Sequence, residues 1–267
     1  MIRCLNAHGS LRDRSCLAPS ALRRRPYPPP SPPPGAIPIS ESEEIARVVP
    51  AIKAIRSALG PRIVISVDTF SAAVARAAVG AGATMVNDVS GGADAAMLST
   101  VAELGVPYVL MHTRGTPATM DSLAVYAGES GSGSGRGSDA AEAAAVVADV
   151  RMALVSGAAQ AIAAGIPRWD LLLDPGLGFA KAPVHNFALL RGGRGEGGGA
   201  TASYPSFYGP SLKSFLTAAI GARQPKDRAW ATAAAVTAAV AAGADFVRVH
   251  DVAAMSDTCK TADAIFR

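Results

Sequence analysis

Stretches with helical periodicity alternate with short apolar runs along most of the chain. After Ser40, apolar residues recur at the 3.6-residue spacing of a helix as far as Gly60-Pro61. Residues 63–69 (IVISVDT) are then rich in β-branched residues without polar alternation, which is typical of a strand buried on both faces. The pattern predicts further strands at 84–90, 108–112, 171–176, 207–211 and 246–252. A helix is predicted before each of these except 207–211, at 71–82, 93–105, roughly 140–164 and 226–243, and a last helix closes the chain.

Strict alternation of strands and helices predicts a parallel sheet with right-handed crossovers. Each predicted strand is apolar until its C-terminal end, where polar residues follow. These are Asp68 and Thr69; Asn87 and Asp88; His112; Asp174; Ser211 and Lys213; and Arg248, His250 and Asp251. In (β/α)₈ barrels the site is built from these strand ends and their loops. We therefore expect an α/β barrel with a site at its mouth.

Three segments interrupt this rhythm. Residues 1–33 are basic and proline-rich, and we expect them to be disordered. The glycine-rich stretches near 128–138 and 192–199 are expected to be flexible loop insertions, and neither has the residue order of a phosphate-binding loop. The expected organisation is thus an N-terminal segment at 1–33 and a barrel domain at 34–267.

Charge and cysteine content exclude several classes of function. Residues 1–39 hold six arginines and one acidic residue, which accounts for the chain's excess of 25 basic over 21 acidic residues. The predicted barrel has no basic excess to indicate nucleic-acid binding. The three cysteines are far apart, without metal spacing, and suit a reducing compartment. No uninterrupted apolar run reaches the roughly 18–20 residues of a membrane span.

The polar residues at the strand ends suggest what the site could bind. A carboxylate and an amide can read the hydrogen-bonding edge of an amino-pyrimidinone ring, and Asp68, Asn87 and Asp174 supply such groups. Lys213 could balance the buried carboxylates. Arg248 lies two residues before His250, so both side chains point the same way on a strand and could bind an anion. Together these groups suit a pterin-like diphosphate.

With these residues in these positions, the chain resembles the dihydropteroate synthases of the pterin-binding barrel group, in their eukaryotic, fungal-type form. The resemblance runs from about residue 34 to the end, apart from the glycine-rich insertions. The stretches that carry it include ISVDTFSAAVARAAVGAGATMVNDVSGG, VLMHTRGTPATM, LLLDPGLGFAK, SLKSF and GADFVRVHDV. These motifs are long and stand in the family's order.

The resemblance implies a role for particular residues. The implied pterin-binding residues are Asp68, Asn87, Met111, Asp174, Gly178, Phe179 and Lys213. The implied 4-aminobenzoate contacts are Ser214 and Phe179, and the implied diphosphate contacts are Arg248 and His250. Lys213, Arg248 and His250 would be the catalytic cations. By contrast, Asp88, Asp251 and His112 are expected to be structural.

The implied reaction joins 4-aminobenzoate to 6-hydroxymethyl-7,8-dihydropterin diphosphate, giving 7,8-dihydropteroate and diphosphate in folate biosynthesis. Mg²⁺ is the implied cofactor, and the enzyme is expected to be a transferase that forms a homodimer. The first 25 residues resemble a transit peptide, because arginine and serine occur with almost no acid. A mitochondrial or a cytoplasmic location is therefore expected.

The chain departs from the family in two places. Leu212 stands where the family has arginine, which we expect to loosen that loop. In addition, nothing in residues 1–30 matches the family's first two βα units, and Asn6 does not match its metal-binding asparagine. No metal-binding residue is therefore assigned, and a barrel of six strands is expected.

Two alternative functions remain open. The first is a pterin-binding remnant or partner subunit with little or no turnover, which is what we expect of the chain as written. The second is a pterin-binding methyltransferase domain. The SLKSF and RVHDV stretches disfavour methyl transfer, because that reaction needs no diphosphate clamp.

Overall fold

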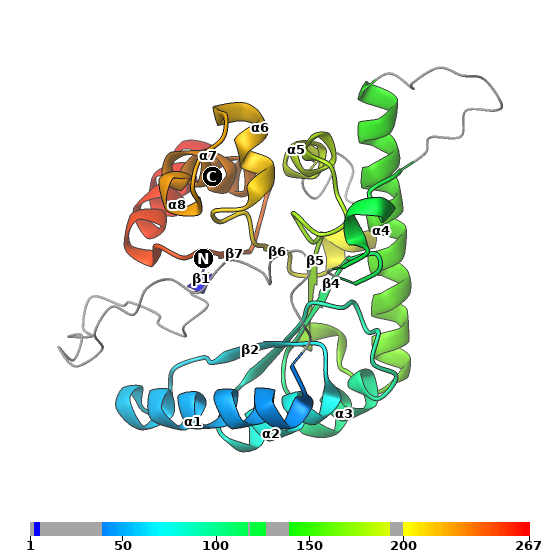
Figure 1. The fold of residues 1–267 in the computed structure, drawn as a ribbon, viewed down its shortest axis with the longest axis vertical. Coiled ribbons are helices and arrows are strands. Elements are labelled where there is room, and N and C mark those ends of the chain that lie inside the picture. Colours follow the sequence, from blue (N-terminus) through cyan, green and yellow to red (C-terminus); the bar gives the residue numbers. More distant parts are fainter. Residues whose placement is uncertain (1–2, 6–38, 117, 127–138, 193–199) are drawn as a thin grey trace.

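The computed structural model describes residues 3–5, 39–116, 118–126, 139–192 and 200–267. The strands are β1 (Arg3–Leu5), β2 (Ser66–Thr69), β3 (Met85–Asp88), β4 (Tyr108–Met111), β5 (Leu171–Asp174), β6 (Phe207–Tyr208) and β7 (Phe246–Arg248). The helices are α1 (Glu41–Leu59), α2 (Ala72–Gly80), α3 (Met97–Leu104), α4 (Asp139–Ala163), α5 (Pro183–Gly192), α6 (Thr217–Ile220), α7 (Ala229–Ala241) and α8 (Val252–Phe266). Figure 1 shows strands on the inside with helices around them.

Helix α1 illustrates how local sequence determines the element boundaries. Ser40 caps its first turn, because the side chain accepts a hydrogen bond from the backbone N–H of Glu43 at 3.3 Å. Three acidic residues in that turn complement the helix dipole. Gly60 ends the helix with φ of 79°, a conformation that glycine adopts without strain.

All strand pairs are parallel, and their register brings the candidate residues together. Strands β2, β3, β4 and β5 form one sheet in that order, and a bridge between Leu173 and Ser206 leads on to β6 and β7. Asp68 stands directly opposite Asn87, and Met111 stands opposite Asp174. The six predicted strands are thus confirmed, although each is shorter than predicted.

The expectation of six strands was wrong, because the described residues include a seventh. Strand β1 pairs in parallel with β7 along Phe246, Val247 and Arg248. Three residues are too few to show strand periodicity, so the sequence pattern did not reveal them. Their position is physically sensible, since they cover an edge of β7 that would otherwise expose unpaired backbone groups. Among the described residues no ladder joins β1 to β2.

Helix α4 is the longest element and packs on the sheet through one face. Its buried face consists of Val146, Val150, Leu154, Ala158 and Ala161. By length and composition alone α4 could cross a membrane, the one such helix among the residues described. Glu142, Asp149 and Arg151 interrupt its apolar character, so it holds no uninterrupted apolar run of membrane-spanning length. Core helices often meet the same criterion, and this buried stripe is the pattern of a helix packed on a core.

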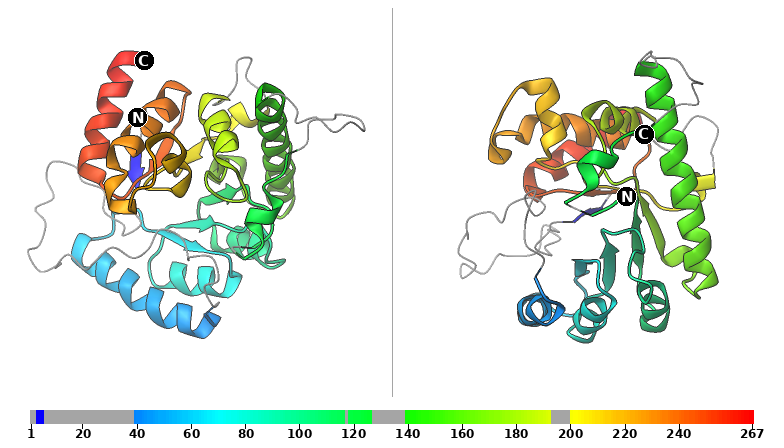
Figure 2. Two further views of the ribbon diagram at one scale, coloured as in Figure 1. Left: turned by 45° about the horizontal axis from the view of Figure 1, so that its top comes forward. Right: turned by 45° about the vertical axis from the view of Figure 1, so that its right-hand side comes forward.

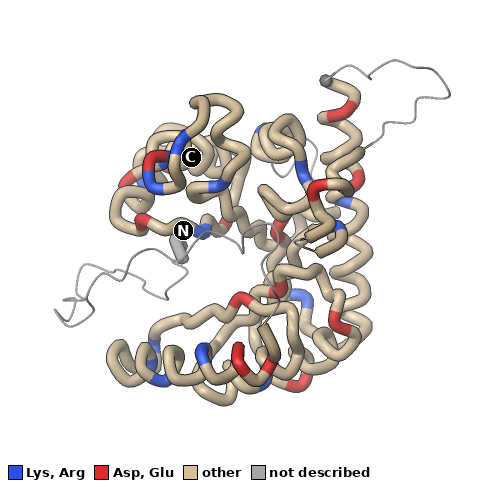
Figure 3. The backbone as a smooth tube through the Cα atoms, viewed as in Figure 1, with Lys and Arg blue, Asp and Glu red and all other residues tan. Residues whose placement is uncertain are grey.

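The remaining helices cover the sheet in neighbouring pairs. Helix α1 packs on α2 and α2 on α3, while α7 packs on both α5 and α8 (Figure 2). Helices α5 and α6 were not among the predicted elements. Figure 3 shows acidic and basic residues interspersed along the described elements. The predicted disordered segment and the glycine-rich insertions fall outside the described residues, apart from β1 and Gly192.

Candidate functional site

One group of polar side chains lies at the C-terminal ends of β2, β3 and β7, and we call Asp68, Asn87 and Arg248 the rim cluster. The Asn87 Nδ2 donates to Asp68 Oδ1 at 2.9 Å. Arg248 donates to Asp68 Oδ2 at 2.7 Å. The side chains of Asp68 and Arg248 are 39% and 26% exposed, so solvent reaches this ion pair. Asp68 therefore links Asn87 on the next strand to Arg248, which lies 180 positions after Asp68 in the sequence.

The rim cluster leaves one buried acceptor without a partner. Asn87 is only 3% exposed, and its Oδ1 has no hydrogen-bond partner among the described residues. Its Nδ2 is already engaged by Asp68, which determines how the amide is oriented. A buried carbonyl oxygen without a donor costs about 1–3 kcal/mol, and a ligand N–H could recover that free energy.

A second group lies around the end of β5, and we call Asp174, Lys181 and the partly buried Lys213 the buried cluster. Asp174 is 5% exposed, and its Oδ1 accepts from the Gly176 N–H at 2.7 Å. Burial raises the pKa of Asp174, and the neighbouring Lys213 is the largest influence opposing that rise. Burial also lowers the pKa of Lys213 to about 8, against the attraction of Asp174.

Lys213 reaches the loop that follows β5. Its Nζ donates to the carbonyl oxygen of Leu177 and lies 4.6 Å from the centre of the Phe179 ring. Gly178, with φ of 79°, makes this approach possible, because a Cβ there would stand 3.0 Å from Lys213 Cδ. The lysine and this loop thus form one unit beside Asp174.

The other predicted site residues are found as follows. Met111 is buried beside Asp174 in register, and Phe179 is partly exposed. Ser214 is exposed at the start of the short helix Ser214–Leu216. His250 is paired through Nδ1 with Ser211 Oγ at 2.8 Å, whereas Arg248 pairs with Asp68. In the structure the two side chains thus have different hydrogen-bond partners.

Two residues that were expected to be structural, Asp88 and Asp251, accept hydrogen bonds that hold the fold together. Asp88 is fully buried and accepts from the Tyr108 hydroxyl at 2.7 Å and from the Ser90 and Gly92 N–H groups. Asp251 caps α8 by accepting from the Ala254 N–H at 3.2 Å.

The loop at Leu212 is held by hydrogen bonds with another segment. The backbone at Leu212 has φ of 59°, and its N–H donates to Thr232 Oγ1 at 3.0 Å. Arg228 donates to the Leu212 carbonyl at 2.8 Å. A guanidinium from another segment thus bonds the loop that was expected to be loose.

Comparison with known proteins places this arrangement in a family. Residues 30–250 match the family described as pterin binding enzyme. The chain belongs to this family. It is 42% identical over 236 residues to the folic acid synthesis protein fol1 of Pneumocystis carinii, covering 88% of the chain but 30% of that longer protein. It is 39% identical to the dihydropteroate synthase of Synechocystis sp., covering 88% and 74% of the two chains.

Solved structures of pterin-binding enzymes confirm the fold class. The dihydropteroate synthase of Stenotrophomonas maltophilia is 38% identical, with a TM-score of 0.73 over 85% of this chain and 78% of that one. The Thermus thermophilus enzyme in complex with 4-aminobenzoate is 34% identical, with a TM-score of 0.71 over 88% and 80%. The chain is thus an α/β protein of the pterin-binding TIM-barrel type, as predicted, and it spans 30% of the length of its fungal relatives.

The described side chains of this chain do not by themselves fit a Mg²⁺ site. Within the described ranges there is no group of three or more His, Cys, Asp or Glu side chains that could hold a metal ion. The carboxylate nearest the mouth, Asp68, is already paired with Arg248. Mg²⁺ prefers oxygen ligands and usually keeps several waters, so a phosphate group would have to supply much of its coordination.

Sequence reasoning missed Lys181, the third member of the buried cluster. It stands at the end of the LGFAK motif, where a lysine next to glycine and alanine is indistinguishable from a solvated surface residue. The signal that could have found it is its position seven residues after Asp174 in a strand-end loop. In the structure it is 8% exposed.

Proposed function

We propose that the chain is a dihydropteroate synthase, a transferase that condenses 6-hydroxymethyl-7,8-dihydropterin diphosphate with 4-aminobenzoate. The single observation that carries the proposal is the buried, unpartnered Oδ1 of Asn87, held in orientation by Asp68. A pterin ring N–H would satisfy it. Dihydropteroate synthases of similar sequence and fold support the same conclusion.

The proposed pterin contacts divide between the two clusters. Asp174 would accept from the amino-pyrimidine edge, which requires its ionised form, and Lys213 favours that form electrostatically. Lys213 would also donate to a ring carbonyl. Met111 and Gly178 would line the pocket beside the ring.

The proposed chemistry is displacement of diphosphate from the pterin methylene carbon. The C–O bond breaks with its electron pair leaving on diphosphate, and the aniline nitrogen of 4-aminobenzoate bonds to the carbon and loses a proton. Arg248 and His250 would stabilise the leaving group, while Phe179 and Ser214 would contact 4-aminobenzoate. The protein thus works by electrostatic support and positioning.

Arg248 has to exchange partners for this role. It is paired with Asp68 in the structure, so a diphosphate would compete with that carboxylate for the guanidinium. Because the pair is partly exposed, such an exchange is inexpensive. Mg²⁺ is proposed to enter with the diphosphate, and no step is assigned to it, since the described residues do not make a site for it.

Assembly and location are further parts of the proposal. A homodimer is supported by exposed apolar side chains on two neighbouring helices, Trp230 on α7 and Phe266 on α8, and sedimentation of the purified chain tests it. A mitochondrial location is supported by the transit-like first 25 residues and by a plant relative named mitochondrial, 38% identical to this chain. Fusion of residues 1–39 to a fluorescent protein distinguishes it from a cytoplasmic location.

Diphosphate release measures the proposed activity directly. The purified chain would be mixed with both substrates and Mg²⁺, with 4-aminobenzoate omitted as the control. Release that depends on 4-aminobenzoate supports the synthase. Pterin binding without release would indicate a non-catalytic pterin-binding protein instead. Absence of pterin binding would overturn the proposal, and methyl transfer from a methylated folate would assign the chain to the methyltransferases.

A further inference from the structure

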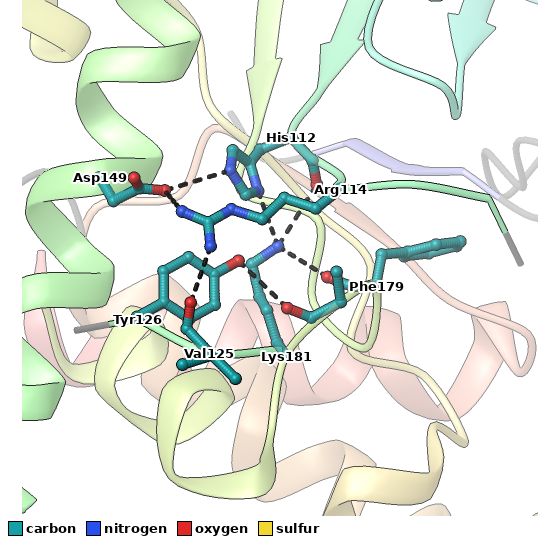
Figure 4. A network of polar contacts seen from close by, with 8 residues as sticks. His112, Arg114, Val125, Tyr126, Asp149, Phe179 and Lys181 are labelled. Atoms are coloured by element: carbon teal, nitrogen blue, oxygen red, sulfur yellow. Dashed lines mark hydrogen bonds and ion pairs between the residues drawn. The ribbon is translucent and has the colours of Figure 1, made fainter. Parts of the chain in front are cut away.

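A buried polar network lies beside the loop that carries Phe179. Figure 4 shows Lys181 at its centre, with His112 and Arg114 from the segment after β4 and Asp149 from α4 around it. Lys181 Nζ donates to the carbonyl oxygens of Phe179 and His112 at 2.9 and 3.3 Å, and lies 2.9 Å from His112 Nδ1. One ammonium thereby joins the loop after β5 to the end of β4.

The ammonium is committed to these contacts. In its protonated form Lys181 can only donate, so His112 Nδ1 then accepts and the ring proton is on Nε2, 3.7 Å from Asp149 Oδ2. Asp149 in turn pairs with Arg114 at 2.7 Å. His112 is 6% exposed, and burial lowers its pKa to about 3, which keeps it a neutral acceptor. When Lys181 is protonated, its three N–H groups are therefore directed at three acceptors.

The loop itself adopts a conformation that needs external support. Ala180 is buried with φ of 50°, in a left-handed region that costs a non-glycine residue about 1 kcal/mol or more. Tyr126 donates its hydroxyl to the Ala180 carbonyl at 3.1 Å. Asn186 accepts from the Gly178 N–H at 2.6 Å. Of these supports, Lys181 is the one that crosses to the neighbouring strand and brings a charge toward Asp174.

We propose that Lys181 is a positioning residue for the reaction. Its ammonium holds the Phe179 carbonyl against the end of β4, and so holds the Phe179 ring where Lys213 and 4-aminobenzoate meet it. Lys181 itself touches no substrate. The predicted effect of Lys181 on substrate binding rests on the proposed function. The predicted effect of Lys181 on the loop does not depend on that function.

Amide hydrogen exchange of the whole chain without ligand tests the loop directly. Lys181→Met keeps the side-chain length and removes the charge and all three donors. We expect the Gly178 and Phe179 amides, which bond Asn186 Oδ1 and Gly176 O, to exchange at least tenfold faster. Unchanged exchange at these amides overturns the inference.

The matched control is Arg56→Met, at the opposite end of the strands. Arg56 also bonds backbone carbonyls from a partly buried position, those of Gly60, Pro61, Ile63 and Gly82. Its loss should lower global stability without changing exchange at Gly178 and Phe179. If both variants accelerate these amides equally, Lys181 is only a contributor to global stability. Should Lys181→Met not fold, Lys181→Gln carries the same test, because a shorter neutral amide cannot reach all three acceptors.

The substrate readout separates positioning from general damage. Lys181→Met should raise KM for 4-aminobenzoate about tenfold and KM for the pterin diphosphate less, about threefold. Phe179 and Gly178 move with the loop, whereas the proposed pterin contacts Asp174 and Asn87 lie on strands β5 and β3. Equal changes in both constants would contradict the inference. If the wild-type chain shows no turnover, the proposed synthase activity fails, and the exchange result alone then decides whether Lys181 holds the loop.

Discussion

The rim cluster and the buried cluster stand side by side at the C-terminal ends of the strands, yet their charges are held in opposite ways. In the rim cluster a cation and an anion pair in partial contact with solvent, at 26% and 39% exposure of the two side chains. In the buried cluster Asp174 accompanies two lysines, Lys181 and Lys213, whose pKa values burial lowers to about 7 and about 8.

This difference indicates which cluster can change partners. Exposed ion pairs contribute little to stability, typically about 0–1 kcal/mol, so the Asp68–Arg248 pair can open at little cost. Buried charges carry a desolvation cost of several kcal/mol, repaid only by well-made contacts. The rim cluster therefore suits groups that exchange with diphosphate, and the buried cluster suits groups that stay fixed.

The largest expected effect follows from neutralising the buried carboxylate. Asp174→Asn replaces an acceptor of the amino-pyrimidine edge with a group that presents a donor, so we expect pterin affinity to fall about 100-fold or more, roughly 2.7 kcal/mol. Calorimetric titration with 6-hydroxymethylpterin measures it. Asp245→Asn is the control, because Asp245 serves the Ser206 N–H and hydroxyl instead. Equal affinity in Asp174→Asn and wild type would remove Asp174 from the site.

The second effect is a rise of stability with pH. The pKa of Lys181 is about 7 and that of Lys213 about 8 in the folded chain, against an ordinary value of 10.5. Between these values the unfolded chain binds more protons, so unfolding becomes harder as pH rises, by up to about 1.4 kcal/mol per pH unit for each lysine. Urea unfolding at pH 7, 8 and 9 measures the slope.

Lys181→Met identifies the source of that slope. The variant should lose the part that arises from Lys181, whereas Arg56→Met should keep it. The charged or titratable groups that face Lys181 are His112, Arg114, Asp149, Asp174 and Lys213. Stability that falls between pH 7 and 9 would contradict the low pKa values of the two lysines.

The third effect is a loss of pterin affinity by Asn87→Ala, which removes the unpartnered acceptor. We expect about a tenfold loss, the value of one hydrogen bond of roughly 1.4 kcal/mol. Ser66→Ala on the adjacent strand is a matched control, because Ser66 Oγ is also buried without a hydrogen-bond partner. It should leave affinity unchanged and cost no stability. Similar losses in the two variants would show that Asn87 acts through the sheet and not by ligand contact.

The contrast between the clusters also shows how far sequence reasoning reaches. Asp68 and Asn87 were predicted to meet because parallel strands end at one edge, and their register confirms it. The Asp68–Arg248 pair was not foreseen, since side-chain direction across two distant strands leaves no periodic signal. Lys181 was missed for a different reason: its burial results from α4 and β4 packing over the loop, which no local pattern records.

The fold was predictable to a similar degree. Long β-branched runs such as 63–69 revealed their strands, because burial on both faces leaves a continuous apolar signal. Helix α5 was missed because it begins at Pro183 and carries His185 and Asn186 on buried positions, which disguises its apolar face. Its two polar residues are buried to serve the loop, since Asn186 bonds the Gly178 N–H and His185 accepts from Ala182.

The smallest expected effect on stability belongs to the rim cluster. Arg248→Gln should change the free energy of unfolding by less than about 1 kcal/mol, because the lost ion pair is partly exposed. The same variant should weaken binding of inorganic diphosphate about tenfold, in a titration with Mg²⁺ present.

The control is Arg76→Gln, which breaks the exposed pair with Glu103 and should match the stability change without the binding change. A stability loss above about 2 kcal/mol would mean that Asp68 and Arg248 form a fixed structural pair. The Arg248 guanidinium could not then exchange Asp68 for diphosphate. The rim cluster would be as fixed as the buried cluster, and the proposed difference between the two clusters would fail.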